Sequence, residues 1–158
     1  MLKKFARALM AGAFVLAAFI PTSAAAAVQS GVPGVVSISI APTVTVADKQ
    51  ILTITVTETC PLLVDFNGQP VIDNFGAAGV QQVQGRTIAH ASGSLTTVCD
   101  GVAHTSVVTA LAFDHPFRSG SGVAQAFVFN VCGMDPTTLV FQCINGSALQ
   151  SVSIVAVH

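Results

Sequence analysis

Strict alternation of apolar and polar residues is the feature that most constrains the fold of this chain. In the segment QILTITVTETC, residues 50–60, apolar side chains alternate with threonines: Leu52, Ile54 and Val56 against Thr53, Thr55, Thr57 and Thr59. A period of two places successive side chains on opposite faces of an extended chain. The segment therefore predicts a β-strand with one buried and one solvent-exposed face. Cys60 falls on the buried face, whereas Glu58 interrupts its apolar row.

Similar patterns recur along the rest of the chain. Residues 36–41 and 151–157 also alternate, and further runs are rich in β-forming residues: 62–66, 80–84, 86–91, 95–99, 106–113, 123–132 and 137–143. Turn sequences separate these runs, at 47–49, 67–68, 100–101, 120–122, 133–136 and 145–146. We predict an all-β fold, namely an antiparallel immunoglobulin-like β-sandwich of seven to nine strands, with a small barrel as the alternative.

The first 27 residues have the organisation of a signal peptide. Three basic residues precede an uncharged apolar run at 8–20, and small residues surround a cleavage position after Ala26 or Ala27. The apolar run is shorter than the roughly 20 residues that a membrane-spanning helix needs. We expect a single domain at residues 28–158, secreted or loosely associated with the cell envelope, and no membrane span after cleavage.

Charge excludes two classes of partner. Three of the six basic residues lie in the predicted signal peptide, so residues 28–158 keep three basic and seven acidic residues, a formal charge of −4. Proteins that bind nucleic acids or anionic membranes use clustered cations. We therefore expect neither partner. An extracellular protein or envelope component is the partner class that fits, and the oligomeric state stays open.

The four cysteines predict two disulfides, since an even number of cysteines in an exported chain is typically oxidised. We favour Cys60–Cys99 and Cys132–Cys143 among the three pairings. The second pair brackets a turn between two β-rich runs, and the first joins distant strands as a bridge across a sandwich does. The spacing of these cysteines lacks the close C-x₂₋₄-C pairs of structural zinc sites, so we expect no metal.

No catalytic constellation is recognisable in the sequence. The histidines of residues 28–158 are not spaced as metal-ligand pairs: His90, His104, His115 and His158. The segment around Ser121 lacks the flanking glycines of a nucleophile elbow, G-x-S-x-G. All four thiols are expected in disulfides, which removes them as nucleophiles. We predict a protein that is not an enzyme and that needs no cofactor.

One irregular segment, DHPFRSGSG, is the candidate binding loop. It begins with Asp114 and His115 and presents Phe117 and Arg118, which we expect to be exposed. An ordinary connection between strands is the alternative interpretation. The chain has ten phenylalanines but no tryptophan or tyrosine, the side chains on which carbohydrate-binding proteins commonly stack sugars.

The segment TTVCDGVAHT, residues 96–105, gathers Cys99, Asp100 and His104 within six positions. Asp-Gly between β-rich runs is a strong signal for a tight hairpin turn, because glycine adopts a positive φ without strain. We interpret the segment as a hairpin corner held by the disulfide of Cys99. His104 is then a cross-strand or surface residue rather than part of a catalytic site.

Three segments together, TITVTETC, VCDGVAHT and GVAQAFVF, resemble a group of small secreted actinobacterial proteins of uncharacterised function. That resemblance implies an exported, disulfide-bonded, immunoglobulin-like sandwich and no activity. The APTVTV segment and the two expected disulfides are also similar to neocarzinostatin-type apoproteins, which bind enediynes. We expect a secreted non-enzymatic protein that interacts with extracellular or envelope components. The alternatives are a carrier of a hydrophobic small molecule and, third, a secreted hydrolase.

Overall fold

The computed structural model describes residues 34–157, so the predicted signal peptide lies outside the described residues. The described chain is all-β, with eight strands and no helix, as the alternation predicts. The strands are β1 (Ser37–Ile40), β2 (Thr43–Ala47), β3 (Ile51–Thr59), β4 (Val71–Gln84), β5 (Thr87–Cys99), β6 (Ala103–Ala112), β7 (Gly120–Met134) and β8 (Phe141–Val157).

Hydrogen bonding runs continuously around the molecule. The strand order is β1-β3-β2-β8-β7-β4-β5-β6, and β3 also pairs with β6, so seven strands form a closed sheet. The pairing is weakest between β5 and β6, where only two residue pairs are matched. The prediction of purely antiparallel strands is wrong at one place, because β2 runs parallel to β8. β1 and β2 follow one another along β3, pairing with its residues 56–59 and 51–53, and β2 pairs with β8 as well.

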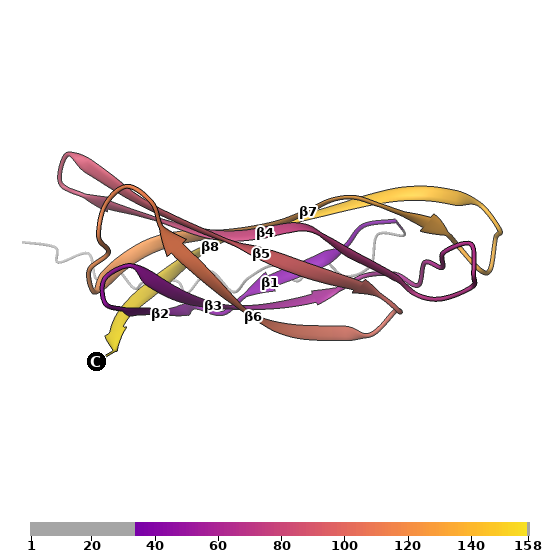
Figure 1. The fold of residues 1–158 in the computed structure, drawn as a ribbon, viewed down its shortest axis with the longest axis horizontal. Helices are drawn as coiled ribbons and strands as arrows, with labels where there is room; N and C mark the ends of the chain where they lie inside the picture. Colours follow the sequence, from indigo (N-terminus) through magenta and orange to yellow (C-terminus); the bar gives the residue numbers. More distant parts are fainter. Residues whose placement is uncertain (1–33, 158) are drawn as a thin grey trace, which may run out of the picture.

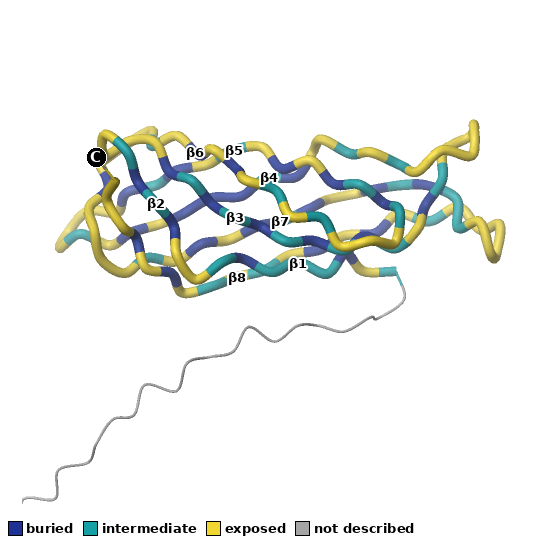
Figure 2. The backbone as a smooth tube through the Cα atoms, turned by 90° about the horizontal axis from the view of Figure 1, so that it is seen from below, coloured by how far each residue is buried: buried dark blue, intermediate teal, exposed yellow. Residues whose placement is uncertain are grey.

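Most core residues lie on these strands, where buried positions alternate with more exposed ones along the backbone (Figure 2). On β3, Leu52, Ile54 and Val56 are fully buried, as predicted, and each contributes about 1.5–3 kcal/mol relative to exposure. The threonines of β3 face outward, where Thr57 Oγ1 lies 2.9 Å from Thr105 Oγ1 on β6. The alternation in residues 50–60 therefore correctly predicts both the strand and which of its faces is buried.

The disulfide Cys132–Cys143 joins directly opposite residues of β7 and β8. The turn predicted at 133–136 is displaced, because Gly133 and Met134 still belong to β7. The loop begins at Asp135, whose Oδ1 accepts a hydrogen bond of 2.8 Å from the Thr137 amide. This local bond gives the chain an alternative to the β-ladder and ends the strand.

Asn145-Gly146 is not the predicted turn but lies inside β8. A Cβ atom at Gly146 would lie 2.4 Å from the Val36 carbonyl oxygen, so the glycine permits the close approach of two backbones. The Asn145 carbonyl accepts a hydrogen bond of 3.0 Å from the Val36 amide. Glycine is required at this position because the Val36 backbone packs against it, not because the chain turns there.

Two other predictions of local structure are wrong. Residues 62–66 form no strand, because only Val64 makes isolated bridges there. Pro61 and Pro70 flank this segment, and each lacks the amide that a ladder requires. Residues 120–122 are not a loop but the start of β7, where Gly122 lets β8 and β4 approach closely.

The closed sheet is elongated, and its two ends carry different segments (Figure 1). One end holds the turn between β2 and β3, the loop 113–119 and the end of β8. The opposite end holds the loop between β7 and β8 and the segment 61–70. The candidate binding loop therefore lies at one end of the molecule. Residues 99–101 lie toward the other end, beside residues 60–63.

Candidate functional site

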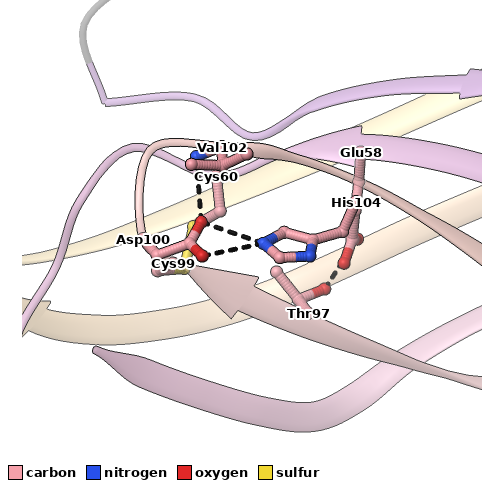
Figure 3. Close-up of a disulfide and its surroundings, with 7 residues drawn as sticks. All are labelled: Glu58, Cys60, Thr97, Cys99, Asp100, Val102 and His104. Carbon is pink, nitrogen blue, oxygen red and sulfur yellow. Dashed lines mark hydrogen bonds and ion pairs between the residues drawn. A yellow bond between two sulfur atoms is a disulfide. The ribbon is translucent and has the colours of Figure 1, made fainter. Parts of the chain in front are cut away.

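The Cys-Asp-Gly-x-x-His segment forms a corner, not a two-residue hairpin (Figure 3). Cys99 is bonded to Cys60, as predicted, so neither thiol is available as a nucleophile. Gly101 has a φ of 82° and donates its amide to the Cys60 carbonyl over 3.0 Å. Beyond the corner the chain separates, since β5 continues pairing with β4 and β6 pairs with β3.

His104 is oriented by Asp100 at this corner. Its Nε2 lies 2.9 Å from both carboxylate oxygens of Asp100, and it is partly buried on β6 opposite Glu58. Hydrogen bonds from the Val102 amide and from His104 hold the pKa of Asp100 below its usual value. Asp100 and His104 thus form an acid–base pair with each other, and the neighbouring Cys99 is in a disulfide and is not a free thiol.

Glu58 is buried within the apolar row of β3, with 1% of its surface exposed. The interruption predicted from its charge does not occur, because the side chain keeps the inward phase of the strand. Thr97 Oγ1 donates a hydrogen bond of 2.9 Å to Glu58 Oε2, while Oε1 has no partner among the described residues. Burial is the main cause that raises the pKa of Glu58, opposed by the Thr97 bond and by His104.

Glu58 should make the protein less stable as pH rises. Because its folded pKa is raised, the stability that it contributes is complete below its ordinary value of 4.5 and is lost as pH rises through the folded pKa. Glu58→Gln keeps an acceptor for Thr97 and removes the ionisation. We expect equal melting temperatures for both proteins near pH 4 and a higher one for the variant at pH 8. An advantage that is the same at every pH would contradict this prediction.

The candidate binding loop contains a second acid–base pair that the sequence does not reveal. Asp114 binds the ring of His90 on β5, and its Oδ1 accepts the backbone amides of His90 over 2.8 Å and of the adjacent His115 over 2.7 Å. The hydrogen bond from the His90 side chain is the main cause that lowers the pKa of Asp114 to about 2. The His90 ring also stacks on Phe113 at 5.9 Å. This pair fixes the first part of the loop.

The second part of the loop is fixed by the core. Phe117 is completely buried, so the expectation that it is exposed is wrong: the loop folds back and uses it as an anchor. Arg118 is exposed as expected. Gln82, buried on β4, accepts the Arg118 amide over 3.0 Å and donates to the Arg118 carbonyl over 2.8 Å. The loop is therefore pre-organised by hydrogen bonds from neighbouring strands.

A pocket of about 590 Å³ opens beside this loop, and we call it the end pocket. Its apolar lining comes from Val46, Phe117, Ala156 and Val157. Its polar lining comes from Asp48, Lys49, Arg118 and Ser119. Only Phe117 and Arg118 belong to the predicted binding residues, whereas Asp114 and His115 do not line the pocket.

Three segments far apart in the sequence create the end pocket. Ala156 continues the inward row of Val152 and Ile154 on β8. It is exposed nevertheless, because at this end of the closed sheet it lines the pocket. The Ala156 amide donates to Ser119 Oγ over 3.1 Å, which ties β8 to the loop. The sequence predicts the β2–β3 turn and the loop separately, but no local pattern signals that they meet.

Among residues 34–157, no three His, Cys, Asp or Glu side chains are placed to hold a metal ion. That part of the chain also has no helix that could span a membrane. The geometry presents a pre-organised pocket with an apolar lining and a few polar groups, the usual form of a small-molecule site. No protein-family model matches the sequence, and no curated protein is significantly similar to it.

Proposed function

We propose that this protein is a secreted, non-enzymatic binding domain that carries a hydrophobic small molecule in its end pocket. The pocket itself supports the proposal: about 590 Å³ lies within the roughly 300–1,000 Å³ of small-molecule sites. Its wall is pre-organised, since Gln82 holds the Arg118 backbone through two hydrogen bonds. A site that is ordered before binding loses less entropy when the ligand enters.

Export is part of this proposal. The basic and apolar pattern of residues 1–27 supports a signal peptide, and two disulfides are compatible with an oxidising extracellular environment. The resemblance to small secreted actinobacterial proteins agrees with this compartment. We place the protein outside the cell, free or loosely bound to the envelope.

We also propose that the closed sheet is an immunoglobulin-like sandwich whose edges meet. One group of strands would be β1-β3-β6, and the other β2-β8-β7-β4-β5. The links between the groups are short, namely two residue pairs between β5 and β6 and three between β2 and β3. The Cys60–Cys99 bridge would then join the two layers. This architecture commonly places ligand-binding loops at one end, where the end pocket lies.

Filling the pocket tests the proposed function. We expect the purified protein to bind a neutral hydrophobic dye such as Nile red, with a rise in fluorescence. Ala156→Phe should reduce this binding at least about tenfold, because the ring occupies the pocket that its inward strand position faces. Ser153→Phe is the matched control, since it adds the same ring to the outward face of β8. Equal binding by the two variants would contradict the proposal.

An extracellular interaction role is the second candidate function. Large apolar side chains are exposed at the end opposite the pocket, and we call them the apolar end: Phe66, Leu139, Val140 and Phe141. Phe66 is 91% exposed and Leu139 is 73% exposed. Exposed apolar patches are typical of protein interaction sites. The Ala156→Phe experiment separates the two candidates, because it leaves the apolar end unchanged.

A further inference from the structure

Cations are scarce in the described chain and concentrated at one place. Residues 34–157 contain three basic side chains, Lys49, Arg86 and Arg118, against seven acidic ones. Two of the three, Lys49 and Arg118, line the end pocket. They come from segments about 70 residues apart in sequence, so only the fold brings them together. The end pocket thus gathers positive charge in an otherwise acidic protein.

Hydrogen bonds fix the backbone positions from which both cationic side chains extend. Lys49 occupies a tight turn at a φ of 62°, where a side chain other than that of glycine is uncommon. Its carbonyl accepts the Phe117 amide over 2.8 Å, which joins the turn to the loop. The neighbouring Arg118 backbone is bound on both sides by Gln82. Both side chains therefore start from fixed positions at the edge of an apolar pocket.

No acidic side chain of the described residues forms an ion pair with either cation. Asp48 is the one described acidic residue that lines the pocket, so these three charged residues leave it with a net positive charge. A positive rim on an apolar wall is complementary to a molecule with an anionic group and an apolar body. A positively charged ligand would meet two like charges at the entrance.

We propose that the ligand of the end pocket is an amphipathic anion, such as a long-chain carboxylate. Lys49 and Arg118 bind its charged group, and the apolar lining takes its hydrocarbon body. This inference rests on the proposed function, because it requires that the end pocket holds a small molecule. It adds the charge of that molecule and the two residues that recognise it.

Three probes that differ only in the head group test the proposal: dodecanoate, dodecanol and dodecylammonium, each below its critical micelle concentration. We expect dodecanoate to bind at least about tenfold more tightly than dodecanol by isothermal titration calorimetry, and dodecylammonium to bind most weakly. The advantage of dodecanoate should decrease as salt concentration rises, because salt screens the attraction.

Charge variants locate the effect. Lys49→Gln and Arg118→Gln should each weaken dodecanoate binding by about threefold to tenfold and leave dodecanol binding unchanged. Asp48→Asn should strengthen dodecanoate binding, since it removes the opposing charge. Arg86→Gln is the control, because Arg86 is exposed in the turn between β4 and β5 and does not line the pocket. Melting temperatures of all variants check that they fold.

The outcomes separate this inference from the function on which it rests. If neither Nile red nor any of the three probes binds, the carrier function itself is contradicted; if Nile red binds and none of the probes does, only the amphipathic anion is contradicted. If dodecanol binds as tightly as dodecanoate, or if Arg86→Gln matches the two pocket variants, the pocket is a carrier site and the anionic ligand is wrong. Selective loss of dodecanoate binding in the Lys49 and Arg118 variants supports both proposals.

Discussion

Phe117→Ala should lower the free energy of unfolding by about 3–5 kcal/mol, the range for truncating a fully buried phenylalanine. The ring is the anchor of loop 113–119, so its removal leaves a cavity under the loop and takes away part of the lining of the end pocket. We expect the midpoint of urea denaturation to fall, with little change in its slope, and dye binding to fall with it.

Phe113→Ala is the control for this variant. Phe113 belongs to the same loop, but it is 71% exposed and stacks on His90 at the surface. A surface substitution of this kind changes stability by about 0.5 kcal/mol. A loss for Phe117→Ala no larger than that for Phe113→Ala would show that the loop is not anchored in the core.

Removal of the Cys60–Cys99 disulfide is the second large effect that we expect. The bond closes a separation of 39 residues, and the loss of chain constraint on replacing both cysteines by alanine corresponds to about 4 kcal/mol. Both cysteines are also fully buried, so the alanines leave a small cavity. The double variant should have a much lower urea midpoint than the unmodified protein under non-reducing conditions.

The Cys132–Cys143 bond provides the comparison. It closes only 11 residues, already held by the β7–β8 ladder, so its replacement should cost about 3 kcal/mol or less. Intact mass should confirm that each double variant retains the other bond. A larger loss on removing Cys132–Cys143 would contradict the ranking, and with it the structural importance of the corner at Asp100.

Much of the fold follows from local patterns in the sequence. The alternation around Leu52 predicts a strand and its buried face, because side-chain direction in a strand depends on position alone. The favoured cysteine pairing is confirmed, since the β7–β8 hairpin brings Cys132 opposite Cys143. Less of the end pocket could be predicted from the sequence. The candidate loop contributes Phe117 and Arg118 to the pocket, whereas Asp114 binds His90.

The wrong predictions for individual residues share one physical cause. Burial of Glu58 and Phe117 depends on what the other strands leave open, and a charge or a loop position gives no information about that. Gly146 is needed where the Val36 backbone approaches, although its sequence, Asn-Gly, is typical of a turn. Non-local packing overrides local preference at each of these positions.

The sequence by itself determined the all-β class, most of the strands, the inward face of β3, the presence of two disulfides and the scarcity of positive charge. These depend on side-chain period, cysteine count and composition, which are properties of short segments or of the whole chain. Only the tertiary structure decided that β2 runs parallel to β8, that the sheet closes, and that Lys49 and Arg118 share one pocket. Closure joins segments from both ends of the chain, and no local pattern encodes which segments will meet.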